Sequence, residues 1–439
     1  MTPATAALAT QELEARTMKK VRWRILPYVF LLYYVAFLDR ANVAFAKLTM
    51  SADLGFSEAV YGFGAGVFFI GYLLLEIPGA LIVERWGARR WLARILVTWG
   101  ICTMLVGLVN TANQFYLTRF LLGTAEAGFF PGIIIYLNHW FPSRHRARAV
   151  ARLLMASPVA LATGGPIAAI FLKWNYLDLP GWRWVFIAEG VPAIILGFVT
   201  LYVMTDRPQN SMWLSNEERD WLNAELEAER QRKGKAGHLS IGQALRSPTV
   251  LTLASITFIA NIGIQGFFLW LPTTVQKASG YSASMSAVIS GLPFVIAVVA
   301  VLFTSWSSDR TGERCFHTAV PLMLAAVIFP VTTSADLSFG WLLFWLSVSA
   351  AAIYGFGPPY WTLPTMTLGE SAAAAAVGFI NSFAGLGGFV GPTVVGAILS
   401  SGYTFSSAVY FLSACFLTAG LLTLLIRRRL IRSLEKTSS

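Results

Sequence analysis

Charged residues and cysteines are scarce in this chain. Only 13% of its 439 residues are charged and 56% are hydrophobic, whereas soluble domains carry about 25% charged residues. The three cysteines, Cys102, Cys315 and Cys415, stand singly in apolar stretches, which excludes a disulfide framework and a thiolate metal site. This composition excludes an ordinary soluble enzyme.

The sequence also lacks the motifs of several functional classes. It contains no GxxxxGK[ST] phosphate-binding loop, which argues against an ATP-driven protein. Its four histidines lie in loops or at the ends of apolar runs, without metal-ligand spacing: His139, His145, His238 and His317. No pair of a nucleophile and a base stands out. We therefore expect no enzymatic activity, no metal and no organic cofactor.

Long apolar runs dominate what is present, and a membrane-spanning helix needs about 20 such residues. In the first half the runs lie at residues 25–46, 59–83, 91–109, 114–138, 149–172 and 184–204, and in the second half at 249–275, 284–305, 317–335, 340–363, 373–400 and 404–426. The predicted fold class is therefore an all-α integral membrane protein with twelve transmembrane helices. Its first partner is the lipid bilayer.

The net charge of +11 could indicate a nucleic-acid partner, but the basic residues flank apolar runs rather than forming one basic domain. Of the 33 Lys and Arg residues, 27 fall on the side that holds the termini and the central loop, and four fall on the other side. The positive-inside rule then places both termini in the cytoplasm. Residues 1–24 have no cleavable signal and form an N-terminal tail, and residues 427–439 form a C-terminal tail.

The two halves of the chain look like a repeat. Residues 84–89 match residues 309–314 at an offset of 225, and two further pairs of glycine-proline segments match at offsets of 226 and 227. This predicts two six-helix bundles, at residues 25–204 and 249–426, with a binding site between them. Residues 205–248 form a cytoplasmic central loop, in which Ser215 and Glu218 make a capping-box pattern that predicts a short surface helix.

Charged side chains inside a spanning helix are costly and need a reason. The first half holds Asp39 and Arg40 in its first span and Arg119 and Glu126 in its fourth. For these four residues a purely structural ion pair, or snorkelling to the surface, is the alternative to a functional role. Glu76 and Glu189 fit helix-packing acids better, and their roles stay open. The predicted spans of the second half contain no charged residue, so they can supply only neutral donors and rings, at Asn261, Gln265, Tyr354, Tyr360, Trp361 and Asn381.

Four motifs identify a family resemblance. They are Asp39-Arg40-Ala41-Asn42, the Glu84-Arg85-x-Gly-x-Arg-Arg loop, the segment from Arg119 through Glu126 to Pro131, and Trp140-Phe-Pro-Ser-Arg-x-Arg-Ala. With these the chain resembles the major facilitator superfamily and, within it, the anion:cation symporter family of bacterial sugar-acid, tartrate and phthalate importers. Residues 181–184 and 206–208 look more like the tartrate and phthalate branch. Glu84 departs from the aspartate usual in the loop motif.

The resemblance implies proton-driven symport of an organic anion. It implies that Asp39 and Glu126 carry protons and that Arg40, Arg119 and Tyr72 face the substrate. From their polar side chains within the spans, we also expect Asn42, Gln265, Tyr354 and Asn381 to contact the substrate. A guanidinium suits a carboxylate because its planar fork binds both oxygens. We rank Glu126 as the main coupling site, because it has no adjacent base in the sequence, whereas Asp39 borders Arg40 and would serve partly as its partner.

The two loop motifs are expected to act as cytoplasmic gates that pair with helix ends in one state and release them in the other. Their residues are Glu84, Arg85 and Arg89 in the first half and Asp309, Arg310 and Arg314 in the second. A pure topology signal is the alternative interpretation of these charges.

The leading hypothesis is a monomeric, proton-coupled importer of a small carboxylate in the inner membrane. A proton antiporter that exports drugs and a sugar carrier stay open as alternatives, although two arginines argue against a cationic substrate. A membrane sensor on a transporter scaffold and an integral membrane enzyme are disfavoured. The sequence names neither the carboxylate nor the number of protons.

Overall fold

The computed structural model describes residues 3–235, 247–334, 336–367 and 370–438, and these residues form helices and no β-strands. The first half comprises α1 (Pro3–Asp53), α2 (Glu58–Trp86), α3 (Ala88–Val106), α4 (Ala112–Glu126), α5 (Phe129–Trp140), α6 (Ser143–Leu154), α7 (Ala156–Phe171) and α8 (Gly181–Val203). A 3-10 turn (Pro208–Asn210) and α9 (Asn216–Lys235) follow. The second half comprises α11 (Pro248–Ser279), α12 (Ala283–Ile289), α13 (Leu292–Thr311), α14 (Cys315–Ile328), a 3-10 turn (Phe329–Thr333), α15 (Phe339–Gly355), α16 (Gly357–Thr367), α17 (Glu370–Ser400) and α18 (Phe405–Ser438).

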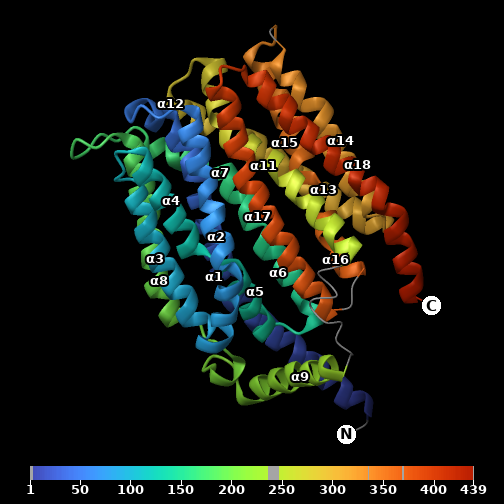
Figure 1. Cartoon of the computed structure of the whole chain (residues 1–439). Coiled ribbons are helices and arrows are strands. Elements are labelled where there is room, and N and C mark those ends of the chain that lie inside the picture. Colours follow the sequence, from blue (N-terminus) through green and yellow to red (C-terminus); the bar gives the residue numbers. More distant parts are fainter. Residues whose placement is uncertain (1–2, 236–246, 335, 368–369, 439) are drawn as a thin grey trace.

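The helices run side by side as a membrane-type bundle (Figure 1), which confirms the predicted all-helical fold class. In the described part of the chain, eleven stretches are long and apolar enough to span a membrane. The predicted span that is not among these eleven is the third, residues 91–109, which corresponds to α3 and is helical over 19 residues. Arg89, Arg90 and Arg94 lie in its first two turns, so its hydrophobic stretch is shorter than that of its neighbours.

The repeat predicted from the sequence recurs in the backbone. Gly87 after α2 and Gly312 after α13 both have positive φ, at 85° and 71°, and each donates its amide to the carbonyl four residues earlier. Glycine adopts such a positive-φ conformation at a helix end without a Cβ clash. The helix of the fourth predicted span also breaks between α4 and α5, and that of the tenth breaks at the corresponding place between α15 and α16.

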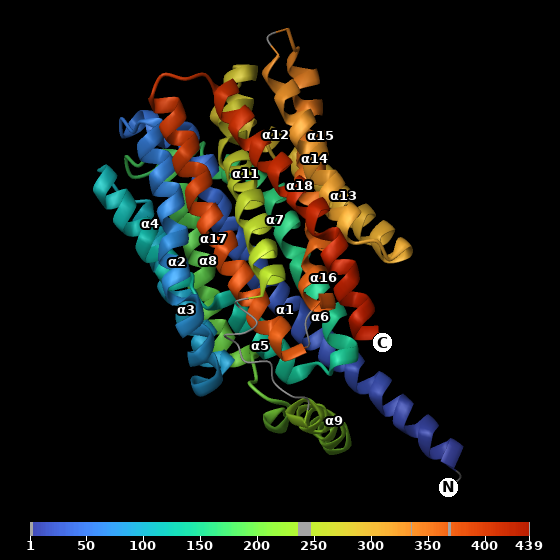
Figure 2. The same cartoon turned by 45° about the vertical axis from the view of Figure 1, so that its right-hand side comes forward.

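One helix is longer than its predicted span. α1 begins at Pro3 rather than near residue 25, because residues 3–24 are rich in Ala, Leu, Glu, Lys and Arg, which favour helix and contain no interior Gly or Pro. Figure 2 shows this N-terminal part projecting beyond the bundle.

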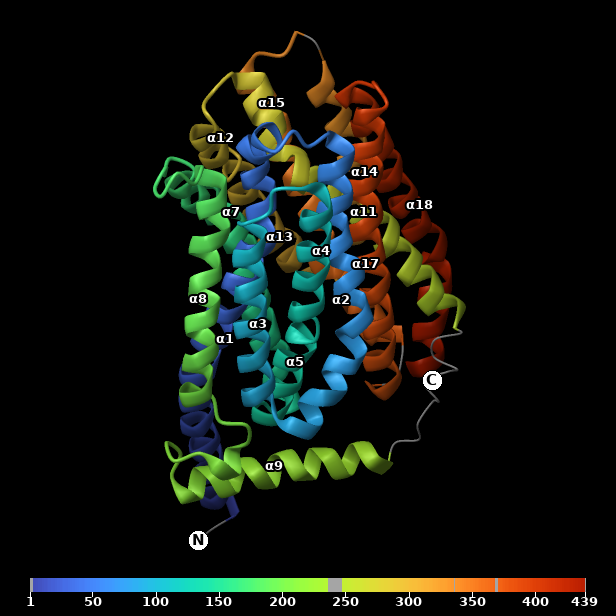
Figure 3. The same ribbon diagram turned by 60° about the vertical axis from the view of Figure 1, so that its left-hand side comes forward.

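The predicted surface helix of the central loop is confirmed as α9, which lies across the end of the bundle near the N-terminus (Figure 3). The amide of Ser215 donates to Glu218 at 2.9 Å and the amide of Glu218 donates to the Ser215 hydroxyl at 3.2 Å, as the capping box predicts. Glu218 also accepts a hydrogen bond from Lys20 of α1 at 2.8 Å. The central loop is therefore anchored to the N-terminal tail.

The two halves meet along α2 and α17, which run together in Figures 1 and 3, and along α7 with α12 and α13. Glycines permit the close approach: a Cβ on Gly62 would lie 2.4 Å from the Pro392 carbonyl oxygen, and a Cβ on Gly165 would lie 2.0 Å from that of Ala287. Small residues at helix contacts are typical of packing in membranes, where helices gain by close backbone approach.

Candidate functional site

The centre of the first half contains an ion pair between α1 and α4. The Arg40 Nη2 lies 2.6 Å from Glu126 Oε1, and its Nε donates to the same oxygen at 2.8 Å. Glu126 is fully buried at the C-terminal end of α4, and the Arg40 side chain is 24% exposed. The second oxygen of Glu126 has no hydrogen-bond partner. The Glu126 carboxylate therefore pairs with an Arg40 guanidinium that is still partly accessible to solvent.

This pairing corrects the expectation that Asp39 serves as the partner of Arg40. Glu126, which has no adjacent base in the sequence, takes that place. Adjacent residues of a helix project about 100° apart, so sequence neighbours do not face each other. Asp39 and Arg40 point to different sides of α1, and Arg40 meets a residue 86 positions away in the chain. Sequence adjacency was the wrong guide to the partner.

Aromatic rings surround the Arg40 guanidinium. Its central carbon lies 5.0 Å from the ring centre of Tyr72, 5.2 Å from Phe37 and 5.8 Å from Phe68. Such faces stabilise a cation that has lost part of its hydration. The structure thus brings Tyr72, which the family resemblance assigns to the substrate, next to Arg40.

Arg119 also lies near the ring of Phe68. Its guanidinium carbon is 4.9 Å from that ring centre, and it is only 3% exposed. It donates long hydrogen bonds of 3.4 Å to the carbonyl oxygens of Gly64 and Ala65, while its Nη1 has no partner. A buried guanidinium with unused donors can accept an anion at little reorganisation cost.

Asp39 belongs to a second polar cluster, between α1, α3 and α8. It accepts hydrogen bonds from the Thr103 hydroxyl at 2.7 Å and from the Asn42 amide at 3.1 Å. Glu189 of α8 is 7% exposed and interacts electrostatically with Asp39. The structure therefore turns Asn42 away from Arg40 and directs its amide to Asp39.

The neutral residues of the second half lie at different places. Asn381 of α17 donates to Glu76 of α2 at 2.6 Å, a contact between the two halves that the sequence did not reveal. Tyr354 packs edge-on against Phe294 with ring centres 5.7 Å apart, and Gln265 is half-buried in α11. Asn381 is connected to the charged cluster through its partner, because Glu76 is one helical turn from Tyr72 on α2.

A further charged cluster, which sequence reasoning missed, sits at the end of the bundle opposite α9. Lys47 is 4% exposed, lies 2.5 Å from Glu58 and stacks on the rings of Tyr61 at 4.4 Å and Trp270 at 4.6 Å. Lys277 of α11 reaches the same glutamate at 3.7 Å. Lys47 follows Arg40 by seven residues, two turns along α1, and that helical spacing was the available signal.

The residues of the two loop motifs pair within their own halves in the part of the chain that the structure describes. Glu84 lies 3.9 Å from His139, and the Arg89 amide donates to Asp206 at 2.8 Å. Arg314 lies 2.7 Å from Asp309. Arg85 is exposed, and Arg310 stacks on the ring of Trp306 at 5.6 Å. Their gating role stays a prediction.

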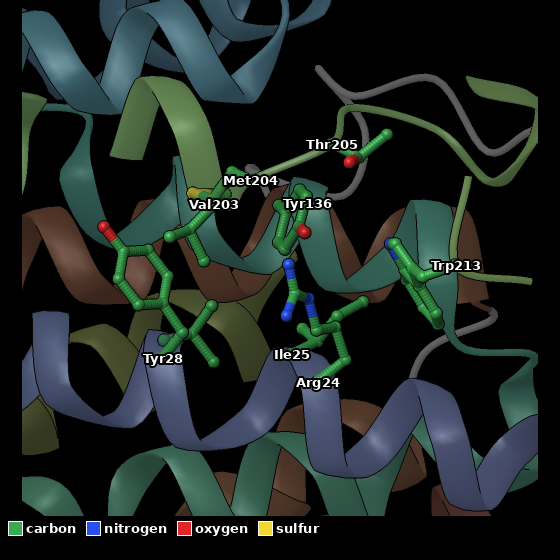
Figure 4. Close-up of a pocket in the computed structure, with 9 residues that line it drawn as sticks. Arg24, Ile25, Tyr28, Tyr136, Val203, Met204, Thr205 and Trp213 are labelled. Carbon is green, nitrogen blue, oxygen red and sulfur yellow. The ribbon is translucent and has the colours of Figure 1, made fainter. Parts of the chain in front are cut away.

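One small cavity lies away from the candidate site. The cavity in Figure 4 lies at the α9 end, where the side chain of Arg24 points toward Tyr136. It is lined by residues of α1, α5, the end of α8 and the segment after α8, and none of the residues predicted to bind substrate or protons lines it.

Known proteins resemble this chain over nearly its whole length. A protein described as "Putative tartrate transporter" from Agrobacterium vitis is 42% identical, over 98% of this chain and 95% of its own. A "Quinolone resistance transporter" from Acinetobacter baumannii is 36% identical, over 97% and 98% of the two chains. These relatives are transporters, in agreement with the expectation of no enzymatic activity.

Solved structures with the same fold include the inward-open xylose transporter XylE from E. coli, with a TM-score of 0.72 at 15% identity over 94% of this chain and 99% of that one. The sequence pattern of the family described as Major Facilitator Superfamily matches residues 29–392. The chain is a multi-pass membrane transporter that belongs to the Major Facilitator Superfamily.

Proposed function

We propose that this transporter imports a small carboxylate together with protons. The observation that carries the proposal is the Arg40–Glu126 pair, in which a buried carboxylate occupies a guanidinium that a substrate carboxylate could use instead. The Agrobacterium vitis relative, 42% identical, supports tartrate as the first substrate to test. A dicarboxylate has two anionic groups, which suits two arginines that both lie near the ring of Phe68.

Coupling follows from competition for Arg40. When Glu126 is ionised it pairs with Arg40 and the empty site carries no unpaired charge there. Protonation of Glu126 weakens this pair, and the freed guanidinium can bind the substrate. Substrate binding and protonation then favour each other by the same free energy, because linkage between two bound species is reciprocal.

The proposed orientation has both termini and α9 in the cytoplasm of a bacterial inner membrane. The 27 Lys and Arg residues on the α9 side support it. Single cysteines at the exposed positions Asn113 and Ser338 should react with an impermeant thiol reagent from outside, whereas one at the exposed Met212 should not. The opposite labelling pattern would reverse the topology.

Transport itself is tested with the purified chain in proteoliposomes. We expect uptake of labelled tartrate to rise when the outside is made acidic, and a panel of mono- and dicarboxylates to compete with it. Collapse of the proton gradient with an ionophore should leave exchange of substrate but abolish accumulation. Uptake that is indifferent to the gradient would eliminate proton coupling.

The quinolone-resistance relative at 36% identity motivates the competing function, proton-driven export of a drug. A fluoroquinolone therefore belongs in the same panel. Transport of this drug from the cytoplasmic side to the outside in exchange for protons, with no carboxylate uptake, would favour the antiporter. Uptake of tartrate without drug transport would favour the importer.

A further inference from the structure

The cluster around Lys47, at the end of the bundle opposite α9, has no role in the proposed competition for Arg40. Its arrangement repeats the one around Arg40. Both cations lie on α1, seven residues apart and therefore on one face of the helix. Each lies near aromatic rings and pairs with one carboxylate, Lys47 with Glu58 at 2.5 Å and Arg40 with Glu126 at 2.6 Å. The same set of groups thus occurs twice along α1, about 10 Å apart.

We propose that Lys47 is an outer anion-binding site, which receives a carboxylate of the substrate from the external side before the substrate reaches Arg119 and Arg40. Its ligand is a small organic anion, which binds by displacing Glu58 from the Lys47 ammonium. This inference rests on the proposed import of a carboxylate and extends it to the entrance of the pathway.

The outer cluster has more positive charge than its own acid can balance. Glu58 lies between two ammonium groups, 2.5 Å from that of Lys47 and 3.7 Å from that of Lys277. Among the described residues, neither lysine has a second carboxylate within salt-bridge distance. Asp53, the last residue of α1, accepts a hydrogen bond from the Trp182 indole at 2.8 Å. Because Glu58 can pair with Lys277, whose side chain is 72% exposed, an incoming carboxylate can replace it on Lys47 without leaving it unpaired.

Helix α2 connects this cluster to the central arginines. The ammonium of Lys47 lies 4.4 Å from the ring centre of Tyr61. One turn further along α2, backbone carbonyl oxygens accept hydrogen bonds from Arg119, and one turn beyond them the ring of Phe68 lies near both Arg119 and Arg40. The positions on α2 that contact successive cations are therefore about 5 Å apart. A small anion can pass from one cation to the next, and a pathway lined by positive charge raises the local concentration of anions.

The two halves close over the outer site in this structure. Lys47 is 4% exposed, and its ammonium lies 4.6 Å from the ring centre of Trp270 on α11. Further along the same interface, the Thr393 hydroxyl oxygen of α17 lies 2.9 Å from the position of a Cβ on Gly66 of α2. A cysteine at position 393 therefore lies between the two halves, within two turns of Tyr61, and can report the local charge when the outer side opens.

The experiment measures the charge selectivity of labelling at this cysteine. Thr393→Cys is introduced into the full-length chain with Cys102, Cys315 and Cys415 replaced by serine, and cells are treated from outside with an anionic or a cationic thiosulfonate reagent. The ratio of the anionic to the cationic rate is divided by the same ratio for a free thiol in solution. We expect a corrected ratio of roughly ten, the lower end of what electrostatic focusing gives. Because both reagents need the same opening, the ratio does not depend on how often the outer side opens.

Substitutions in the cluster should move this ratio in opposite directions. Lys47→Gln should lower it about threefold or more, and Glu58→Gln should raise it, because like charges repel and opposite charges attract the reagent. The matched control is Lys173→Gln, an exposed lysine at the same end of the bundle, which should leave the ratio unchanged. If Lys47 only holds the halves together, Lys47→Gln will speed labelling by both reagents equally, and the unchanged ratio will overturn the proposal. Should Lys47→Gln not fold, Glu58→Gln and Lys277→Gln decide by the same opposite shifts.

External tartrate tests the ligand. A bound carboxylate neutralises the ammonium, so tartrate should lower the parent ratio toward that of Lys47→Gln and should not change the ratio in Lys47→Gln itself. Sodium chloride at equal ionic strength is the control for simple screening. If tartrate is transported but changes the ratio no more than sodium chloride does, Lys47 is not a site for the substrate.

The failure of this inference can be told from a failure of the proposed function. If carboxylates are imported but the ratio ignores Lys47→Gln and Glu58→Gln, the function stands and the outer site fails. If no carboxylate is transported, the proposed function fails, and the response of the ratio to these two substitutions alone decides whether Lys47 attracts anions.

Discussion

The two halves of this transporter share a backbone arrangement but differ in the charged residues that they bury. Both place a positive-φ glycine after their second spanning segment, and both break the helix of their fourth. Yet the first half buries Asp39, Glu76, Arg119, Glu126 and Glu189, while the predicted spans of the second half contain no charged residue. A symmetric frame thus holds an asymmetric site.

The difference indicates a division of labour. Charges buried in lipid-facing structures are expensive and are kept where they act. We infer that the first half binds the protons and the anion. The second half contributes only uncharged side chains to the site and moves relative to the first half during transport. The pair Glu76–Asn381 is one place where a charged residue of the first half contacts the second half. Variants in the two halves should therefore differ in kind, and the following experiments test this from the largest effect to the smallest.

The largest expected effect is the loss of uphill transport in Glu126→Gln. The amide mimics the protonated acid, so Arg40 stays available to substrate, but the empty carrier then keeps an uncompensated charge and cannot return. Accumulation of substrate should fall to the level measured without a proton gradient. Exchange of labelled for unlabelled substrate across the membrane should persist. Asn381→Asp, which adds an acid in the other half, is not expected to restore it. Accumulation equal to that of the parent would remove Glu126 as the coupling site.

Next, Arg40→Met should destabilise the protein at neutral pH, because it leaves Glu126 buried without a partner. Removal of one member of a buried ion pair costs about 3 to 5 kcal/mol, and protonation of Glu126 at lower pH should reduce the loss. Thermal unfolding in detergent measures it. The double variant Arg40→Met/Glu126→Gln should recover much of the stability, and Gln265→Leu in the second half should change it little.

Substrate affinity should fall in Arg119→Lys, because a lysine cannot reproduce the planar fork of a guanidinium. A lost charge-assisted contact costs about 1.5 to 3 kcal/mol, or roughly 10- to 150-fold in affinity. Competition binding measures this change, with Tyr410→Phe, at an exposed position of α18 in the second half, as the control. Unaltered affinity in both Arg119→Lys and Arg119→Ala would leave Arg119 a structural role only.

A smaller effect is expected where the two halves lock together at the end opposite α9. Lys47→Met removes the buried ammonium between Glu58 and Trp270, and a loss of about 1 to 2 kcal/mol shifts the open population about 5- to 30-fold. A cysteine at Thr393, which faces Gly66 across the interface, should then be labelled faster from that side. The matched control is Lys277→Met, whose side chain is 72% exposed and whose ion pair should contribute less than about 1 kcal/mol.

The smallest effect concerns the anchoring of α9. Desolvation acts to raise the pKa of Glu218, but hydrogen bonds from Lys20 and the Ser215 amide outweigh it and hold this pKa below the ordinary value. Ionised Glu218 therefore stabilises the contact above its unfolded pKa, and this contribution is lost as the pH falls through the lowered folded value. Hydrogen exchange of α9 should show it, and Glu218→Gln should exchange faster at pH 7 with little further change on acidification. Equal protection of α9 from hydrogen exchange in the parent and in Glu218→Gln would show that Glu218 does not anchor this helix.

Composition and spacing predicted much of this molecule. Apolar runs located the spanning helices, because a lipid environment requires the backbone to satisfy its own hydrogen bonds. The Ser215–Glu218 motif predicted α9, since a capping box is a local interaction. The charged residues inside the spans were found for the same reason: in a sequence with 13% charged residues, each one within an apolar run is visible.

The pairing of these buried residues could not be predicted from the sequence. Asp39 and Arg40 are neighbours in the sequence, but the helix turns them apart. Arg40 pairs with Glu126, while Asp39 accepts hydrogen bonds from Thr103 and Asn42. The same holds for Glu76 with Asn381, which are 305 residues apart. By itself the sequence determined which residues are costly to bury and on which helices they lie, because both follow from local composition and the 3.6-residue period. Only the tertiary structure decided which of them pair, because pairing depends on how separate helices are rotated and packed against one another.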